Sequence, residues 1–553
     1  MSKSFSIGMI ADPHYYEPFA DYGADRHVVS GREGASVRTL QQTVKSTRLF
    51  NENSLTLPAM LEACAREGLK TIIIAGDLTD DGQIGCMAGA VAILERFARE
   101  QGMRFFLTPG NHDVFGMHGR HHVKAFIQEN GIGVQTSSEG ENAAPLQYCQ
   151  GYPETIERLR AYGFFRQADH LLWESPFGPS DRLEDRQYPI WSPDGKTCHH
   201  QIDASYLVEP EDGLWLLSLD ANVFVPRDGM PDQTDPASIE DSTNAGWNAV
   251  VRYRPYLLEW MKDVRRRATA LGKHLVTFTH YPTIDPLKGT RHLELELFGP
   301  TQFYKRTPTP ETSTVIAATC IGSVYSGHMH VDDTTTVVAE GQSLTNHALP
   351  CAGAFPPLWK VLTIGDAGTS LDERIVEVER FDAFFDIYRL ELAHADLATW
   401  GLFDSQSYTD LVDAQVRMMA FNRYLIDEWP ADLATSLREK TLAQMLETAG
   451  AMPIGGQSTA IPMSDLLADY YRLRNGQRFA LQRMSPDRVA LYRQFARSLA
   501  GTVSDDAFAS RMRIFARMLG CYLGLWQAPA VATNPSQPDA TNRTVRPAMR
   551  FSA

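Results

Sequence analysis

Short apolar runs that end in polar residues recur along the chain before residue 330. They are rich in Ile, Val, Leu or Phe, and they cover residues 5–10, 71–75, 104–108, 214–219, 275–279 and 321–326. Runs of this length and composition are typical of buried strands. Stretches with helical spacing of apolar positions precede three of them, at residues 57–67, 88–100 and 256–270. This alternation predicts an α/β fold in which helices pack over a sheet.

Five of the six runs lead directly into a short polar cluster. The clusters are Asp12-Pro13-His14, Gly76-Asp77, Gly110-Asn111-His112-Asp113, His280 and Gly327-His328-Met329-His330. In α/β sheets, ligands collect beyond the carboxyl ends of the strands, so we expect the five clusters to meet. Their carboxylate, amide and imidazole groups are the ligands that hard or borderline divalent cations prefer.

Individual positions suit different tasks in a site with two metals. Asp77 has two carboxylate oxygens and can bridge two ions, whereas Asn111 offers a neutral carbonyl oxygen. His328 and His330 lie two residues apart, with Met329 between them facing away, so that each can serve a different metal. The pattern therefore predicts a binuclear metal-dependent hydrolase of phosphate esters.

The ordered set Asp-x-His, Gly-Asp, Gly-Asn-His-Asp, His and Gly-His-x-His resembles the signature of the calcineurin-like metallophosphoesterases, over about residues 5–365. This resemblance implies a β-sandwich flanked by helices, which refines the α/β prediction. It also implies two metal sites that share Asp77. One would be formed by Asp12, His14, Asp77 and His330, and the other by Asp77, Asn111, His280 and His328. No ligand position departs from the pattern of the family.

The expected mechanism is attack on phosphorus by a hydroxide that bridges the two metals. The ligand types leave the metals open among Mn, Fe, Zn and Co. His112 is not needed as a ligand, so it would hydrogen-bond the phosphoryl group or protonate the leaving oxygen, and Asp113 would orient its imidazole. Arg32, Arg38 and Arg48 are candidates for a bidentate contact with a substrate phosphate.

The substrate is expected to be a small phosphorylated molecule. The long insertions and the helical C-terminal region resemble bacterial cyclic-nucleotide-type phosphodiesterases of this superfamily, which favours a small diester such as a cyclic nucleotide or a glycerophosphodiester. A phosphomonoesterase or nucleotidase with the same dimetal centre is the alternative enzyme. A binding or scaffold protein that presents its helical region to a partner is the alternative from another class.

The domain organisation is predicted from changes in sequence texture. Residues 1–380 would form the catalytic domain, with insertions at about 15–54 and 118–200 that lack sustained periodicity and follow metal clusters. We expect these insertions to be lids that shape the substrate pocket. Residues 381–527 would form an α-helical domain, and residues 528–553, rich in Pro, Thr, Asn and Ser, a flexible tail.

The helical domain is predicted from N-caps and apolar stripes. Ser407 resembles the start of a capping box, and Ser485 is followed by Pro486, a favoured first helical residue. These helices could cover the active site, bracket the sheet or form a homo-oligomer, and the sequence does not choose among the three.

Composition narrows the classes of partner. The chain carries 52 Lys and Arg against 67 Asp and Glu, for a net charge of −15, which makes binding of a nucleic-acid polymer unfavourable. The seven cysteines are widely spaced and contain no CxxC pair, so we expect buried, reduced thiols. The chain shows neither an N-terminal signal segment nor an apolar span long enough to cross a membrane, which predicts a cytoplasmic protein.

Overall fold

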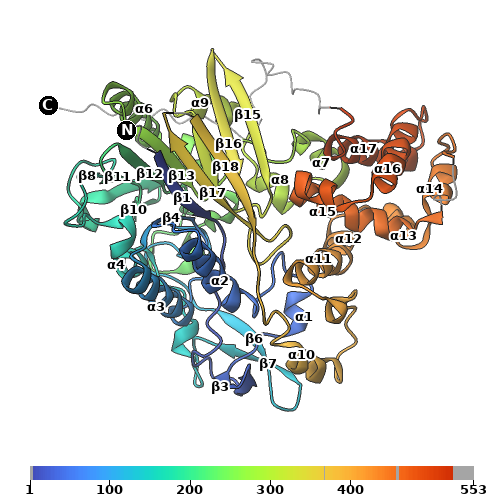
Figure 1. The fold of residues 1–553 in the computed structure, drawn as a ribbon, viewed down its shortest axis with the longest axis horizontal. Helices are drawn as coiled ribbons and strands as arrows, with labels where there is room; N and C mark the ends of the chain where they lie inside the picture. Colours follow the sequence, from blue (N-terminus) through green and yellow to red (C-terminus); the bar gives the residue numbers. More distant parts are fainter. Residues whose placement is uncertain (1–3, 367, 456–459, 527–553) are drawn as a thin grey trace.

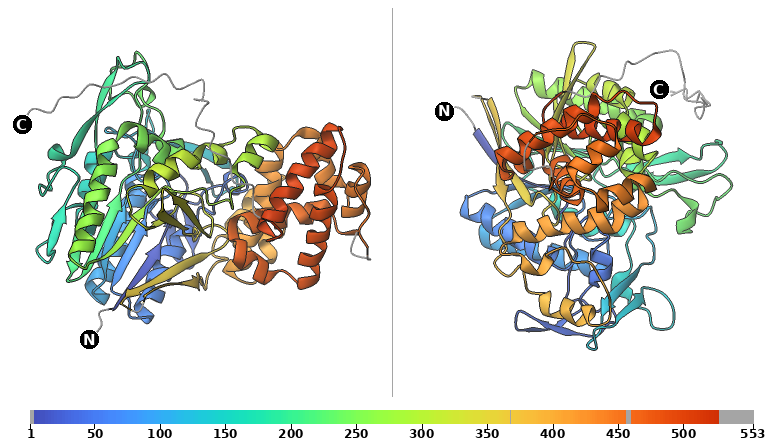
Figure 2. Two further views of the ribbon diagram at one scale, coloured as in Figure 1. Left: turned by 90° about the horizontal axis from the view of Figure 1, so that it is seen from above. Right: turned by 90° about the vertical axis from the view of Figure 1, so that its right-hand side faces the viewer.

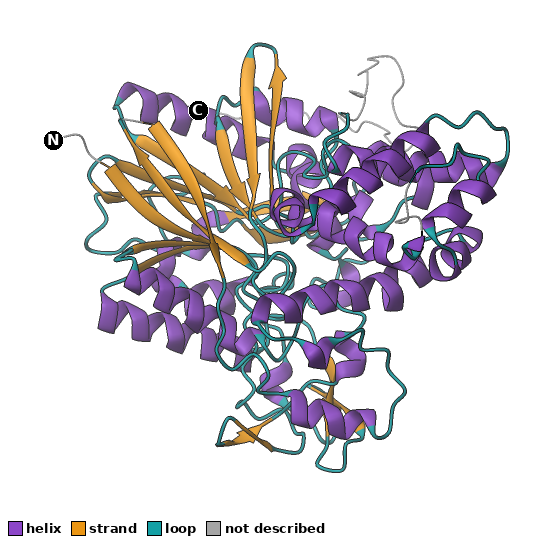
Figure 3. Ribbon diagram, turned by 45° about the vertical axis from the view of Figure 1, so that its right-hand side comes forward, coloured by secondary structure: helices purple, strands orange, loops and turns teal. Residues whose placement is uncertain are grey.

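Two β-sheets face each other at the centre of the molecule (Figures 1 and 3). The structure is a computed structural model that describes residues 4–366, 368–455 and 460–526. The first sheet has five strands in the order β18-β17-β1-β4-β5. Its strands are β1 (Ser4–Ile10), β4 (Thr71–Ala75), β5 (Arg104–Thr108), β17 (Leu358–Gly365) and β18 (Gly368–Ile375). The strands β1, β4 and β5 run parallel, while β17 is antiparallel to both of its neighbours.

The second sheet has seven strands in the order β15-β16-β14-β13-β12-β11-β8. They are β8 (Leu172–Glu174), β11 (Tyr206–Glu211), β12 (Leu214–Leu219), β13 (His274–Thr279), β14 (Ser323–Ser326), β15 (Asp333–Ala339) and β16 (Gln342–Ala348). The four central strands β12, β13, β14 and β16 are parallel. Side chains of both sheets, such as Ile73, Leu216 and Phe278, belong to one hydrophobic cluster between them. The predicted β-sandwich is confirmed.

Helices cover both outer faces of the sandwich (Figure 3). The helices α2 (Asn53–Arg66) and α3 (Ile84–Gln101) join the hydrophobic cluster of the five-stranded sheet through residues such as Leu61 and Leu94. The helices α5 (Gly246–Tyr253), α6 (Pro255–Ala270) and α9 (Pro310–Ala317) pack on the seven-stranded sheet around Trp215 and Leu217. The six predicted strands and three predicted helices are all present. The strands could be predicted because continuous apolar runs of this kind are typical of strands that are buried on both faces of the sheet.

The two insertions contain more regular structure than expected. Residues 15–54 hold the hairpin β2 (His27–Val29) and β3 (Arg32–Ala35), followed by α1 (Leu40–Thr43). Residues 118–200 hold β6 (Val123–Ile127) paired with β7 (Gly133–Ser137), α4 (Tyr152–Arg158), and β9 (Gln187–Trp191) paired with β10 (Cys198–Ile202). Strands of three to five residues are too short to leave a periodic pattern, which is why the sequence reads as loop there.

The chain after β18 is helical. Its helices are α10 (Phe385–Leu392), α11 (Tyr408–Met419), α12 (Leu425–Asp427), α13 (Ala431–Glu439), α14 (Leu442–Thr448), α15 (Met463–Arg483), α16 (Pro486–Ala500) and α17 (Ala507–Tyr522). Ser407 and Ser485 cap α11 and α16, each accepting a backbone hydrogen bond. Figure 2 shows the later helices as a block beside the sandwich, where they enclose their own hydrophobic cluster.

The two hydrophobic clusters meet along α11. Phe385 of α10 and Leu411 of α11 belong to the cluster of the sandwich, whereas Met419 belongs to the cluster of the later helices. The predicted tail at residues 528–553 lies outside the described residues. All seven cysteines are free, and five are buried as predicted, whereas Cys198 is half-buried and Cys320 is exposed. No helix within the described ranges is long and apolar enough to cross a membrane.

Candidate metal centre

The five polar clusters converge at the carboxyl ends of the parallel strands, as predicted. On one side of the centre, the Nε2 atoms of His14 and His330 lie 3.0 Å apart. His14 Nε2 is 3.6 Å from Asp77 Oδ2, and His330 Nε2 is 3.9 Å from Asp12 Oδ1. These residues follow β1, β4 and β14, so the fold joins groups that are 316 residues apart in the sequence.

The other side of the centre is built around His280, which follows β13. Its Nε2 lies 3.3 Å from Asp77 Oδ2, 3.0 Å from Asn111 Oδ1 and 3.2 Å from His328 Nδ1. Asp77 Oδ2 therefore faces both His14 and His280. Two groups of close donor atoms, Asp12, His14 and Asp77 in one and Asp77, His280 and His328 in the other, share this carboxylate.

Most of these residues have strained backbones. Their φ angles are positive, in the left-handed region that residues other than glycine rarely adopt: Asp12 49°, His14 44°, Asp77 48°, His328 71° and His330 53°. The loops hold one another in place, because His14 N donates to Asp77 O and His328 N donates to the Asp12 carboxylate. Such strain is concentrated at functional sites, where the surrounding structure maintains it.

Two glycines allow the loops to approach the carboxylates. A Cβ atom at Gly110 would lie 2.1 Å from Asp77 Oδ1, and one at Gly327 would lie 2.3 Å from Asp12 Oδ2. Any side chain at either position would displace a candidate ligand. The glycines of the Gly-Asn-His-Asp and Gly-His-x-His clusters therefore have a steric role.

Hydrogen bonds to backbone carbonyls orient two of the imidazoles. His280 Nδ1 lies 3.2 Å from Ala75 O, and His328 Nε2 lies 3.1 Å from Thr243 O. A carbonyl can only accept, so the proton is on that nitrogen and the other nitrogen presents a lone pair to the centre. Asn111 Nδ2 similarly donates to Thr243 Oγ1, which turns the amide oxygen inward.

Several groups of the centre are already in the protonation state that a metal ligand needs. Burial lowers the pKa of His14 and His328 well below the usual value, and lowers that of His330 to about 3, so these imidazoles are neutral, as metal ligands must be. Burial raises the pKa of Asp77, but the adjacent His280 and His112 outweigh it and hold the carboxyl ionised.

Two groups of the centre are not in that state. Burial raises the pKa of Asp12 well above its usual value, and Asp77 overcomes the effect of burial on His280 and raises its pKa to about 9, so these two would lose a proton when a metal binds. The donor set contains inward-facing lone pairs around a shared carboxylate, and it fits two metal ions.

His112 lies beside this centre, and its orienting carboxylate is Asp81. His112 Nδ1 is 3.0 Å from Asp81 Oδ1, which leaves Nε2 free of protein partners among the described residues. We expected Asp113 to have this role, and that prediction is wrong. The buried Asp113 carboxylate instead accepts hydrogen bonds from Leu78 N, Thr79 N, Thr79 Oγ1 and Gly110 N, at 2.9 to 3.2 Å. Adjacent residues in this turn point in different directions, so Asp113 ties the two loops together.

Asp113→Ala is therefore expected to act on stability. It would leave several buried donors without an acceptor, and each unsatisfied group costs about 1–3 kcal/mol, so we expect a loss of about 3 kcal/mol in the free energy of unfolding. Urea denaturation followed by circular dichroism measures this. Unchanged stability combined with a large loss of turnover would instead support an orienting role for Asp113.

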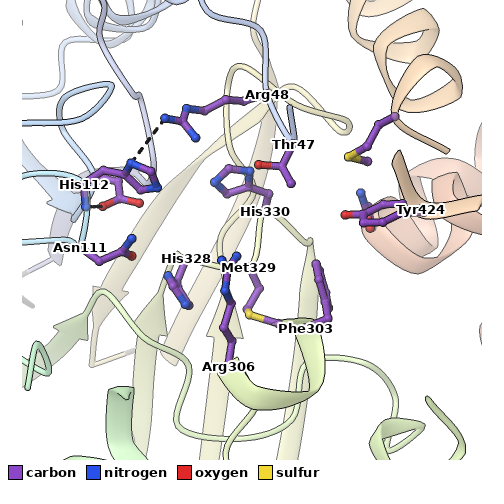
Figure 4. A pocket seen from close by; sticks show the side chains of 13 residues that line it. Thr47, Arg48, Asn111, His112, Phe303, Arg306, His328, Met329, His330 and Tyr424 are labelled. Carbon is purple, nitrogen blue, oxygen red and sulfur yellow. Dashed lines mark hydrogen bonds between the residues drawn. The ribbon is translucent and has the colours of Figure 1, made fainter. Parts of the chain in front are cut away.

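A pocket opens from the metal centre (Figure 4). Its lining residues are Thr47, Arg48, Asp77, Asn111, His112, Phe303, Arg306, His328, Met329, His330, Met419, Tyr424 and Asn475. The insertion at 15–54 contributes Thr47 and Arg48, which agrees with a role in shaping the pocket, whereas the insertion at 118–200 contributes no lining residue. Of the three candidate arginines only Arg48 reaches the pocket, since Arg32 stacks on Phe19 and Arg38 pairs with Asp80.

A comparison with known families decides the identity of this centre. The sequence model of the family described as calcineurin-like phosphoesterase matches residues 5–332, which include all seven candidate ligands. The chain belongs to this family. It is accordingly a phosphoric ester hydrolase of the class that uses a dinuclear metal centre.

The solved structures that match this calcineurin-like phosphoesterase are distant from it. A dimetal phosphatase from Danio rerio is 12% identical, with a TM-score of 0.33, over 67% of this chain and 98% of that one. The sulfate thiohydrolase SoxB from Thermus thermophilus is 13% identical, with a TM-score of 0.29, over 70% and 60%. The phosphopantetheinyl hydrolase of Mycobacterium tuberculosis is 13% identical, with a TM-score of 0.24, over 63% and 89%. A search of curated proteins finds no match.

Several residues of the phosphoesterase site escaped the sequence analysis. Asp80 binds Arg48 and Asp81 binds His112. Their position, three and four residues after Asp77, is the feature of the sequence that could have indicated a place near the centre. Two adjacent acidic residues in a turn normally indicate a solvated surface, so the sequence does not single them out as residues of the site. Cys351 Sγ donates to Asp12 O and lies in one group with His14 and His330, yet nothing near it in the sequence marks it.

Proposed function

We propose that this protein is a metal-dependent phosphodiesterase that hydrolyses a small phosphodiester of the cyclic nucleotide or glycerophosphodiester type. The observation that carries the proposal is the pocket, which is lined by Asp77 and whose lining extends from His112 and His330 to Phe303 and Tyr424 (Figure 4). A phosphoryl group at the metal centre would direct a second ester substituent toward Phe303 and Tyr424. This second substituent distinguishes a diester from a monoester.

The proposed ligand sets follow the two sides of the centre. Asp12, His14, Asp77 and His330 would hold one metal, and Asp77, Asn111, His280 and His328 the other, in agreement with the distances above. When bound, the metals supply an activated water nucleophile and neutralise the charge that develops on the phosphoryl oxygens. Mn, Fe and Zn all suit these oxygen and nitrogen ligands.

The remaining steps fall to side chains of the chain itself. His112 is placed to give a proton to the leaving oxygen from Nε2, while Asp81 holds its Nδ1 and stabilises the imidazolium. Arg48 is fixed through Nη2, which donates to the backbone carbonyl and carboxylate of Asp80 at 2.6 and 3.0 Å. Its guanidinium lies near His112, where it can hold a phosphoryl oxygen of the substrate (Figure 4).

A phosphomonoesterase or nucleotidase is the second candidate, and a specific observation favours it. Two guanidinium groups, Arg48 and Arg306, line the pocket, while Asp77 is the only carboxylate among the lining residues. This excess of positive charge also suits the dianion of a monoester.

Paired turnover assays test the proposal. Bis(p-nitrophenyl) phosphate and p-nitrophenyl phosphate are compared with Mn²⁺-loaded protein, and a chelated sample serves as control. We expect chelator-sensitive turnover with kcat/KM at least about tenfold higher for the diester, which corresponds to about 1.4 kcal/mol of differential transition-state binding. A preference for the monoester would replace the proposal with the phosphatase. No turnover of either ester at full metal occupancy would favour a binding or scaffold protein.

A further inference from the structure

The wall of the pocket opposite the metal centre is formed by a part of the chain outside the family match. Met419, Tyr424 and Asn475 lie beyond residue 332, where the match ends, and all three line the pocket. They come from the end of α11, the π-helical segment Ala420–Tyr424 that follows it, and α15. The C-terminal helices thus complete a site whose chemistry resides in the sandwich.

Arg306 presents a positive charge to this pocket and forms no ion pair within 4 Å among the described residues. It ends α8 (Gln302–Arg306) and is drawn on the opposite side of His328 and His330 from Arg48 (Figure 4). Its guanidinium has a single hydrogen-bond partner within the described part of the chain, Asn244 Oδ1, at 3.4 Å from Nε. Arg48, by contrast, is paired with Asp80. Asp241 and Glu428 act on Arg306 only at longer range. A half-buried guanidinium without a carboxylate in contact is costly, and a bound anion would relieve that cost.

Asn475 adds a free donor to the pocket from the wall formed by the C-terminal helices. Its Oδ1 accepts a hydrogen bond from Arg474 Nε at 3.2 Å, which assigns the outer position to Nδ2, and no described residue accepts from that nitrogen. Asn475 lies two residues before a break in α15, where Gln477 has φ 34° and ψ −103°. Such a conformation costs about 1–3 kcal/mol and persists where the surrounding structure enforces it.

Packing enforces the break in α15. Asn475 O accepts a hydrogen bond from Asp332 N at 2.7 Å, which ties the helix to the loop after the metal-site histidines. A Cβ atom at Gly476 would lie 2.7 Å from Phe355 Cε1, so only glycine allows this approach. The strained turn therefore fixes Asn475 relative to the centre.

We infer that the substrate carries a second anionic group, a carboxylate or a phosphate, which Arg306 and Asn475 Nδ2 bind within this pocket. The inference rests on the proposed function, because the first phosphoryl group is taken to lie at the metal centre. It narrows the substrate to esters whose organic arm is charged, and it makes the C-terminal helices a determinant of specificity. The acidic chain thereby has a local site for a doubly anionic ligand, despite its net charge of −15.

Calorimetric binding of three compounds with the same carbon skeleton tests the inference. Glycerol 3-phosphate has a neutral arm, 3-phosphoglycerate a carboxylate arm, and glycerol 1,3-bisphosphate a phosphate arm. With Mn²⁺-loaded full-length protein freed of excess metal, we expect both anionic-arm compounds to bind about 10 to 100 times more tightly than glycerol 3-phosphate, the range of one charge-assisted contact. The preference between the two identifies the anion.

Substitutions on one helix provide the matched comparison. Arg306→Gln should reduce the preference for the anionic-arm compounds over glycerol 3-phosphate to about threefold or less, and Arg306→Lys should retain part of it. Lys305→Gln removes the same charge from the exposed neighbouring position of α8 and should change nothing. Asn475→Asp, which replaces the donor with a carboxylate, should also abolish the preference.

Two results would overturn the inference: equal binding of the three compounds by the unaltered protein, or a preference that survives Arg306→Gln. Neither concerns hydrolysis, so the outcome is separate from that of the p-nitrophenyl ester assays. Absence of turnover with an intact Arg306-dependent preference would refute the proposed reaction alone. Turnover without the preference would refute the inference alone.

Discussion

Replacing Asp77 with alanine is expected to lower kcat/KM by about 10⁴-fold or more and to reduce the metal content of the purified protein from two ions per chain to one or none. The expectation follows from the position of Asp77 Oδ2, which lies 3.6 Å from His14 Nε2 and 3.3 Å from His280 Nε2. No other described residue belongs to both groups of donor atoms. Loss of this carboxylate therefore affects both metals at once.

Asn111→Ala is the matched control for Asp77→Ala. Asn111 Oδ1 contacts His280 on one side of the centre, so this change should weaken only the second metal. Metal analysis of both variants after identical loading and dialysis separates the two effects. Equal metal loss in both variants, or two retained ions in Asp77→Ala, would contradict the bridging role.

The second large effect is expected from His112→Ala. We expect kcat to fall by about 10²–10⁴-fold while both metals remain bound, because His112 acts on the leaving oxygen and is not a ligand. The loss should be greater for esters of aliphatic alcohols than for p-nitrophenyl esters, since p-nitrophenolate leaves without protonation. Turnover of the two substrate types by the same variant measures this difference.

Asp81→Asn tests the orientation of His112. It removes the charge of the carboxylate 3.0 Å from His112 Nδ1 but preserves its shape, and it should lower kcat by about 10–100-fold.

The contradicting outcome for His112→Ala is an equal loss of kcat for both substrate types accompanied by loss of metal. That result would make His112 a structural residue of the centre.

The positions of the metal ligands could be predicted from the sequence for two physical reasons: continuous apolar runs form buried strands, and parallel strands bring their carboxyl ends together. Strands such as Thr71–Ala75 and Arg104–Thr108 are continuous apolar runs, and the structure begins and ends them at the predicted residues. Parallel strands place their carboxyl ends together, so polar residues that follow them meet whatever their separation in the chain. The convergence of His14 and His330 is the direct result.

The partner of His112 could not be predicted because sequence proximity is a poor guide to direction within a turn. Asp113 is adjacent to His112 but faces Leu78, Thr79 and Gly110, whereas Asp81, 31 residues away, faces the imidazole. Only the positions of the backbone atoms in both loops decide between the two carboxylates.

The contribution of the C-terminal helices to the pocket could not be predicted from the sequence for another reason. Tyr424 and Asn475 lie in helices with ordinary apolar stripes, and their approach to the centre depends on how the helical block docks on the sandwich. The break in α15 could not be predicted from the sequence either, because packing and not local sequence forces Gln477 to adopt its positive φ. Tertiary contacts override local propensity at such positions.

Anomalous scattering from a Mn²⁺-loaded crystal tests the central claim most directly. The account predicts two peaks about 3.5–4 Å apart, with Asp77 between them, Asp12, His14 and His330 around one, and Asn111, His280 and His328 around the other. A single peak, or peaks away from these seven residues, would contradict it.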